Sequence, residues 1–253
     1  MAGYEVFSAF YDALTENVEY EAWAEYILAL FERFSEKRPQ TVLDLACGTG
    51  SLTERLLQRG LRVIGVDGSA EMLAAAQQKT APFGKKALLL CQDMCDLELG
   101  GTVDGAVCML DSLSHLTTTA AVKEALCRVA DSLPAGGVLI FDVNTPYKHA
   151  HILGDNAYTF DCEDVFCAWQ NTYFPRTKEV RMELNFFVPT GEVYERYTEE
   201  VRERAYSEAT WRRLLREAGF ETAALFGERT FAPPTETEQR WVFAAKKGKN
   251  GKR

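Results

Sequence analysis

The sequence predicts an α/β fold: a doubly wound, mostly parallel sheet of seven strands with an inserted antiparallel β-sheet. Between residues 41 and 143, short apolar runs that suit buried strands alternate with segments of helical periodicity. The first of these strands runs through a turn of small residues directly into a helix. Between residues 146 and 205, apolar and polar positions alternate instead, which is typical of antiparallel hairpins.

Composition limits the possible partners. The chain has 253 residues, 47% of them hydrophobic, which is enough for a full core. A net charge of −9 argues against nucleic acid, which is bound by clustered Lys and Arg. No apolar run approaches the roughly 20 residues of a membrane span, and the N-terminus lacks a signal-peptide pattern. We therefore expect a cytoplasmic protein, monomer or homodimer, that binds a small molecule and neither nucleic acid nor membrane.

The cysteines and histidines do not suggest a metal site. The seven cysteines form no Cys-x-x-Cys pair, and their number is odd. Only three histidines are present. Buried free thiols are therefore expected rather than disulfides or zinc ligands.

The segment from Thr41 to Leu57 combines a strand, a glycine turn and the start of a helix. Gly48 and Gly50 have no β-carbon, so a ligand could approach the backbone of the turn. The following helix directs free N–H groups and its positive dipole end into the same space. Asp44 is the one charged residue in the strand. Taken alone, such a Gly-x-Gly is often only a tight turn.

Thr53 separates two ligand classes. The dinucleotide fingerprint Gly-x-Gly-x-x-Gly/Ala needs Gly or Ala at this position. The sequence Asp-Leu-Ala-Cys-Gly-Thr-Gly over residues 44–50 instead resembles the signature of class I S-adenosylmethionine (SAM)-dependent methyltransferases. The resemblance implies a Rossmann-like methyltransferase fold and SAM as the cofactor. It also implies cofactor contacts at Asp44, Ala46, Cys47, Gly48 and Gly50.

The next two predicted strands end in acidic residues. The strand over 61–66 leads to Asp67, where a carboxylate can accept from both hydroxyls of a ribose. The strand over 87–91 leads to Asp93 and Met94, which in the methyltransferase family contact the adenine ring. A turn or helix-cap role for Asp93 is the structural alternative. As further cofactor contacts we expect Gly68, Met72, Gln92 and Leu110.

The residues before the first strand resemble the N-terminal lid of small-molecule methyltransferases. A helix with an apolar stripe is predicted over residues 20–34. Tyr11, Tyr20 and Trp23 are expected to close over the methionine end of SAM, because a phenol can donate to a carboxylate. The alternative is an aromatic stripe that belongs to the core.

The loop after the fourth strand, predicted over residues 103–110, is where the methyl acceptor should meet the cofactor. It lies beside the switch point of the strand order, where open α/β sheets bind ligands. His115 is the candidate general base. Asp111 could hold an amine acceptor, and Ser112 is a candidate substrate contact. A helix over 118–132 and a strand over 138–143 follow.

The hairpins over residues 146–205 are interpreted as a roof over the substrate. Related enzymes carry such an insert, and Tyr194, Arg196 and Tyr197 are expected to line it, although such a strand face is often only solvated. The SAM-binding core then comprises residues 1–145, with lid helices over 1–36, and 206–246. Its last strands are predicted over 220–226 and 240–245, before a basic disordered tail over 247–253.

The predicted reaction is transfer of a methyl group from SAM to an amine or hydroxyl of a small molecule by in-line displacement. Two alternatives remain. An NAD(P)-dependent oxidoreductase is opposed by Thr53 and by the lack of a Tyr-x-x-x-Lys relay after the fifth strand, where Tyr147 is followed by His151. A non-catalytic SAM-binding module is opposed only weakly, by the polar loop at residues 111–115.

Overall fold

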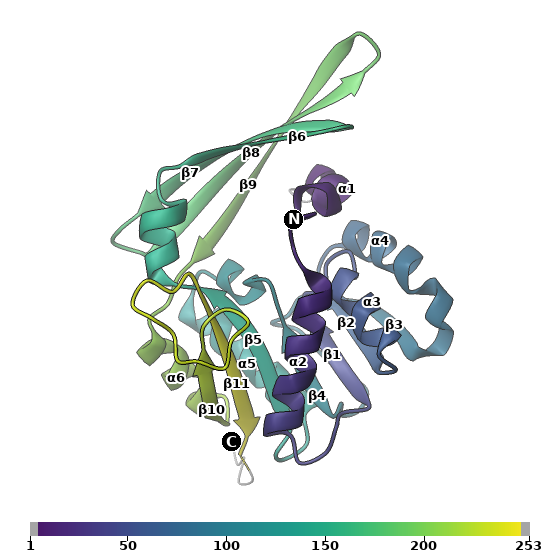
Figure 1. Cartoon of the computed structure of the whole chain (residues 1–253), viewed down its shortest axis with the longest axis vertical. Helices are drawn as coiled ribbons and strands as arrows, with labels where there is room; N and C mark the ends of the chain where they lie inside the picture. Colours follow the sequence, from purple (N-terminus) through teal and green to yellow (C-terminus); the bar gives the residue numbers. More distant parts are fainter. Residues whose placement is uncertain (1–4, 249–253) are drawn as a thin grey trace.

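The computed structural model describes residues 5–248, and the side chains of all of these except 5, 6, 222 and 223. It contains a large sheet with helices on both faces and a smaller sheet above it (Figure 1). The helices are α1 (Glu5–Leu14), α2 (Tyr20–Phe34), α3 (Ser51–Gln58), α4 (Ala70–Thr80), α5 (Thr119–Ser132) and α6 (Glu208–Glu217). The strands of the large sheet are β1 (Thr41–Leu45), β2 (Arg62–Asp67), β3 (Ala87–Cys91), β4 (Gly105–Cys108), β5 (Val138–Asn144), β10 (Phe220–Phe226) and β11 (Arg240–Lys247).

The large sheet confirms the predicted fold class. Its seven strands lie in the order β10-β11-β5-β4-β1-β2-β3. All neighbouring pairs are parallel except those that β11 makes with β5 and β10. The strand order reverses between β1 and β4, and ligands of doubly wound sheets bind outside the carboxyl ends of the strands at such a point.

Two apolar layers hold the large sheet. One cluster joins α2 and α3 to one face, and another joins α5 and α6 to the opposite face. The central strands β4 and β5 are buried along their whole length because both faces are covered. Their carboxyl ends therefore have fixed positions, which suits a site that must align reacting atoms.

The smaller sheet, here called the roof, is antiparallel and has the order β6-β7-β8-β9. It comprises β6 (Ala157–Cys162), β7 (Val165–Phe174), β8 (Glu179–Thr190) and β9 (Val193–Arg204), and a π-helix (Lys148–Leu153) leads into it from β5. Pairing between β7 and β8 ends at Phe166 and Phe187, whereas β8 and β9 stay paired to Thr190 and Val193. The tip of this hairpin therefore projects beyond the rest of the roof (Figure 1).

Three short helical segments complete the described part of the chain. They are the 3-10 helices η1 (Ala81–Lys86) and η2 (Ser112–His115), and the π-helix η3 (Lys148–Leu153). Within the described residues, no helix is long and apolar enough to cross a membrane. No group of His, Cys, Asp and Glu in that part of the chain could hold a metal ion.

Two predicted boundaries are wrong. β4 ends at Cys108 because Leu110 and Asp111 adopt positive φ angles of 55° and 54°, which no strand accommodates. β11 continues to Lys247, so Lys247 belongs to the sheet and not to the tail; its Nζ also donates to the carbonyl of Leu133 at 2.7 Å. The rest of the predicted tail, residues 249–253, lies outside the described residues.

Candidate active site

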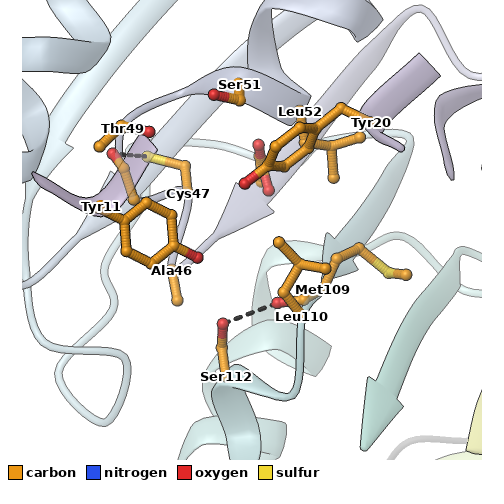
Figure 2. Close-up of a pocket in the computed structure, with 12 residues that line it drawn as sticks. Tyr11, Tyr20, Ala46, Cys47, Thr49, Ser51, Leu52, Met109, Leu110 and Ser112 are labelled. Carbon is orange, nitrogen blue, oxygen red and sulfur yellow. Dashed lines mark hydrogen bonds between the residues drawn. The ribbon is translucent and has the colours of Figure 1, made fainter. Parts of the chain in front are cut away.

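A hollow lies at the carboxyl ends of β1 and β4 (Figure 2). The hollow is walled by the glycine turn after β1, the loop after β4 and the two N-terminal helices. Its lining residues are Tyr11, Tyr20, Asp44, Ala46, Cys47, Gly48, Thr49, Ser51, Leu52, Met109, Leu110 and Ser112.

The two glycines of the turn have different roles. A β-carbon added to Gly48 would meet no atom within 4 Å, so this position leaves open space beside the backbone. A β-carbon on Gly50 would lie 2.9 Å from the Cβ of Ala76 in α4. A cofactor contact at Gly50 therefore stays a prediction, and the missing β-carbon of Gly50 has another role in the structure. Gly50 allows α4 to pack against the turn, and its φ of 79° starts α3.

Asp44 is held by Thr53. The Asp44 side chain is buried, and its Oδ2 accepts a hydrogen bond from Thr53 Oγ1 at 2.5 Å. Burial raises the pKa of Asp44 to about 7, and the bond from Thr53 opposes this rise. From the sequence alone, Thr53 served only as an argument against a dinucleotide-binding fingerprint. In the structure Thr53 orients the acidic residue of the hollow.

Asp67 ties the turn to β2. Its Oδ2 accepts from the N–H of Gly48 at 2.8 Å and its Oδ1 from the N–H of Ser69 at 2.9 Å. Burial raises the pKa of Asp67, and these backbone hydrogen bonds counteract it. The carboxylate therefore sits at the end of β2 as predicted. It does not line the hollow, and neither do Gly50, Gly68 and Met72.

Tyr11 and Tyr20 come from α1 and α2, and Figure 2 shows their hydroxyls pointing into the hollow. Burial, the neighbouring Tyr20 and the charge of Asp111 raise the pKa of Tyr11 well above its usual value. Burial also raises the pKa of Tyr20. Both phenols stay protonated at neutral pH and can donate a hydrogen bond.

Trp23 does not line the hollow. It is buried in the cluster under α2, with its ring edge-on to Tyr26 and the guanidinium of Arg229 5.9 Å from its centroid. This position fits the alternative in which the aromatic stripe belongs to the core. The lid assignment for Tyr11 and Tyr20 has geometric support that Trp23 lacks.

A buried carboxylate from β5 shapes the loop after β4. Asp142 accepts from the N–H groups of Leu110 at 2.6 Å and Asp111 at 3.1 Å, the two residues with positive φ. Arg240 on β11 forms ion pairs with Asp142 and, at 2.7 Å, with Asp111. Burial raises the pKa of Asp142. Sequence reasoning missed Asp142, although it is the lone charge in an apolar strand, as Asp44 is.

Polar side chains continue from this loop to the roof. Asn144 Nδ2 donates to Asp111 Oδ2 and to Glu203 Oε2 of β9, both at 2.9 Å. Lys148 Nζ donates to Asn144 Oδ1 at 2.8 Å. Burial raises the pKa of Asp111, but the charges of Arg240 and Lys148 outweigh it and hold the pKa well below its usual range. Asp111 is therefore an ionised carboxylate beside the hollow.

Other predicted residues lie outside the hollow. His115 is exposed at the end of η2. The side chain of Gln92 bonds both backbone groups of Glu98, and Asp93 Oδ1 accepts from the N–H of Cys95 at 2.8 Å, a turn role. Met94 packs partly buried against the core. Ser112 does line the hollow, and its hydroxyl donates to the carbonyl of Met109 at 2.8 Å.

The structure does not bring Tyr194, Arg196 and Tyr197 to the hollow. Tyr194 lies on the projecting part of β9 and is 67% exposed. Arg196 and Tyr197 pair with Phe187 and Phe186 of β8, and the Arg196 side chain bonds Asn185. Side chains alternate between the faces of a strand, so Tyr194 and Arg196 share one face and Tyr197 the other. Val201 is on the same face as Tyr197 and belongs to one apolar cluster with Phe186 of β8 and Leu14 of α1.

Comparisons with known proteins decide the family. A methyltransferase-domain model matches residues 42–137. The protein YqeM of Bacillus subtilis (strain 168), named as a methyltransferase, is 33% identical over 247 residues, which cover 97% of this chain and 98% of the relative. A solved S-adenosylmethionine-dependent methyltransferase from Clostridium acetobutylicum ATCC 824 is 33% identical with a TM-score of 0.84, covering 97% of this chain and 99% of that one.

The chain belongs to the class I SAM-dependent methyltransferases. This decides against the dinucleotide alternative. A dTDP-3-amino-3,6-dideoxy-alpha-D-glucopyranose N,N-dimethyltransferase of Streptomyces fradiae is 34% identical over 124 residues, which cover 49% of this methyltransferase and 47% of the relative.

The residues of the hollow fit SAM, the cofactor of this methyltransferase. The open space beside Gly48 is the space that a Cβ would fill, and the backbone there is accessible. Asp44 offers a buried carboxylate to a cationic ligand, and Tyr11 and Tyr20 offer donors to a carboxylate. SAM carries an ammonium, a sulfonium and a carboxylate, so it can match both the carboxylate of Asp44 and the hydroxyl donors of Tyr11 and Tyr20.

Proposed function

We propose that this methyltransferase methylates the amine of a small molecule that binds beside the loop after β4, under the roof. The observation that carries the proposal is the ionised carboxylate of Asp111 at this place, fixed by Arg240 and Asn144. A fixed negative charge favours an ammonium over a neutral hydroxyl. The Streptomyces fradiae relative, whose name gives an amino sugar as its substrate, supports an amine.

Bound SAM supplies a methyl group that its sulfonium already activates for displacement. The protein's own residues then have to align the acceptor and exclude water. Tyr11 of α1 and Leu110 of the loop after β4 both line the hollow and narrow its access to water. With SAM bound, the amine lone pair would take the methyl group as the C–S bond breaks, which would give the methylated amine and S-adenosylhomocysteine (SAH).

An amine acceptor that arrives as an ammonium ion must lose a proton before it can attack. Asp111 holds its proton weakly because its pKa is low, so it attracts the ammonium and does not act as the base. His115 is exposed at the end of η2, in the loop that follows Asp111. We propose that His115 receives the proton and passes it to solvent.

The test is methyl transfer from labelled SAM to pairs of acceptors that differ only by an amine or a hydroxyl at one carbon, amino sugars included. We expect the amine of each accepted pair to react and its hydroxyl counterpart not to. The variant Asp111→Asn should raise KM for the amine about tenfold or more, while SAM affinity changes less. Reaction of hydroxyl acceptors alone would refute the proposal.

A further inference from the structure

Helix α1 lies between the roof and the large sheet (Figure 1) and contacts α4 on one side and β6 and β9 on the other. The rings of Phe7 and Phe10 lie 6.3 and 6.5 Å from that of Phe186 on β8. The N–H of Phe7 donates to Glu199 Oε1 on β9 at 2.9 Å. The first turns of α1 are thus attached to the roof.

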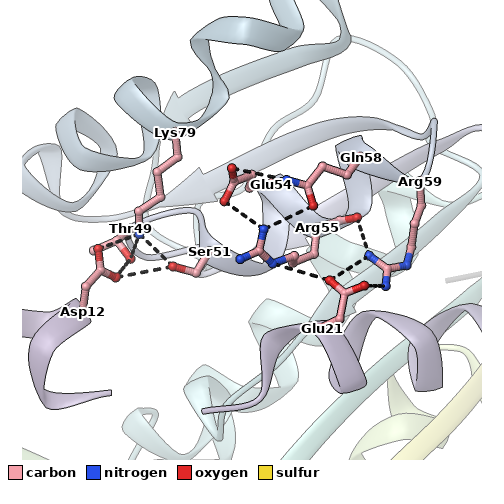
Figure 3. Close-up of polar contacts among 9 residues, drawn as sticks. All are labelled: Asp12, Glu21, Thr49, Ser51, Glu54, Arg55, Gln58, Arg59 and Lys79. Atoms are coloured by element: carbon pink, nitrogen blue, oxygen red, sulfur yellow. Dashed lines mark hydrogen bonds and ion pairs between the residues drawn. The ribbon is translucent and has the colours of Figure 1, made fainter. Parts of the chain in front are cut away.

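The residue that follows Tyr11 attaches α1 to the core. Asp12 Oδ1 accepts from Thr49 Oγ1 at 2.6 Å and from Ser51 Oγ at 3.4 Å, and its Oδ2 accepts from Lys79 Nζ at 2.6 Å (Figure 3). Lys79, in the last turn of α4, also donates to Thr49 at 3.1 Å and to Ser51 at 2.7 Å. One carboxylate and one ammonium therefore join α1, the glycine turn and α4.

Helix α1 is short, so its position depends on these contacts. The helix has 10 residues, and isolated helices shorter than about 12–15 residues are marginal in water. Its position therefore depends on what it touches. Thr49 and Ser51 line the hollow from the core side, and Tyr11 lines it from α1, so the contacts of Asp12 close one edge of the hollow.

We propose that Asp12 and Lys79 are positioning residues: their ion pair holds α1 against the glycine turn, keeps Tyr11 in the hollow and slows the release of SAM and SAH. Asp12 and Lys79 are not among the described residues that line the hollow, so they act through Tyr11, Thr49 and Ser51. The proposal rests on SAM binding and not on the nature of the acceptor.

The experiment compares Asp12→Asn, Lys79→Met and their double variant with the parent chain. The control is Lys123→Met, which breaks an ion pair with Glu217 at 3.2 Å between α5 and α6, away from α1. Two quantities are measured: the dissociation rate of SAH by stopped flow, and hydrogen exchange of the backbone amides of residues 7–14 without ligand.

Each single variant should release SAH about fivefold faster, the size expected for one partly exposed, charge-assisted contact. The double variant should be no faster than either single variant, since all three lose the same ion pair. The amides of α1 should exchange faster in all three, and the control should match the parent. Raised salt should speed release in the parent but not in Asp12→Asn.

Unchanged release and unchanged exchange in Lys79→Met would overturn the proposal. So would a double variant whose effect is the product of the single effects, because that would mean two independent contacts with the ligand. If Asp12→Asn lowers the folded fraction, the decision rests on Lys79→Met, which removes a side chain that is 25% exposed. A parent chain that does not bind SAH would instead contradict the cofactor assignment.

Discussion

Asp142→Asn should destabilise the protein by an amount that the contacts of Asp142 allow us to estimate. The fully buried carboxylate accepts from two backbone N–H groups and from Arg240. Asparagine keeps one acceptor oxygen and turns an NH₂ group toward a donor. Breaking a buried ion pair costs about 3–5 kcal/mol.

The lower end of this range applies to Asp142. Arg240 keeps its ion pair with Asp111 at 2.7 Å, so its charge is not left alone. Burial raises the pKa of Asp142, which shows that its charge is itself costly. We expect a loss of about 3 kcal/mol in the free energy of unfolding. For a chain of this size, this corresponds to a fall of about 6–12 °C in Tm.

Urea unfolding, followed by tryptophan fluorescence, measures this loss. The matched control is Asp104→Asn, because Asp104 also accepts two backbone N–H groups, those of Gln40 and Thr41 at 2.8 Å, but is exposed. It should cost about 1 kcal/mol or less. SAM affinity should fall only in Asp142→Asn, since Leu110 lines the hollow. Equal losses in the two variants would refute the reasoning.

Three further predictions follow from the site. Gly50→Ala should lower stability by about 1–3 kcal/mol through contact with Ala76, whereas the double change with Ala76→Gly should recover part of the loss; thermal unfolding measures both. Burial raises the pKa of Asp44 to about 7, so SAM affinity measured by calorimetry should rise from about pH 6 to about pH 8 as the carboxylate ionises. Thr53→Val removes a hydrogen bond to the ionised carboxylate and should move this rise to higher pH. A SAM affinity that does not change with pH would contradict the role of Asp44. His115→Ala should lower kcat about 100-fold at unchanged SAM affinity. An unchanged kcat would mean that water, and not His115, receives the proton of the acceptor.

Local sequence patterns were sufficient for most of the elements. The prediction of a helix over residues 20–34 and strands over 87–91 and 220–226 matches α2, β3 and β10, because periodicity of apolar residues is a property of neighbouring positions. The glycine turn and Asp44 were found for the same reason. The cap of α4 was also local, since Ser69 accepts from the N–H of Met72 three residues later.

The sequence by itself therefore determined the class of fold, the family and the glycine turn that lines the hollow. Tertiary structure alone decided which distant side chains meet. The pairing of Asp142 with Arg240, 98 residues away, follows from the antiparallel insertion of β11 beside β5. The tip of the β8–β9 hairpin lies away from the hollow because β8 and β9 stay paired beyond the last pair between β7 and β8. Strand periodicity does not encode this difference in pairing. Gly50 makes room for Ala76 because helix packing places α4 there, a contact that no local pattern shows.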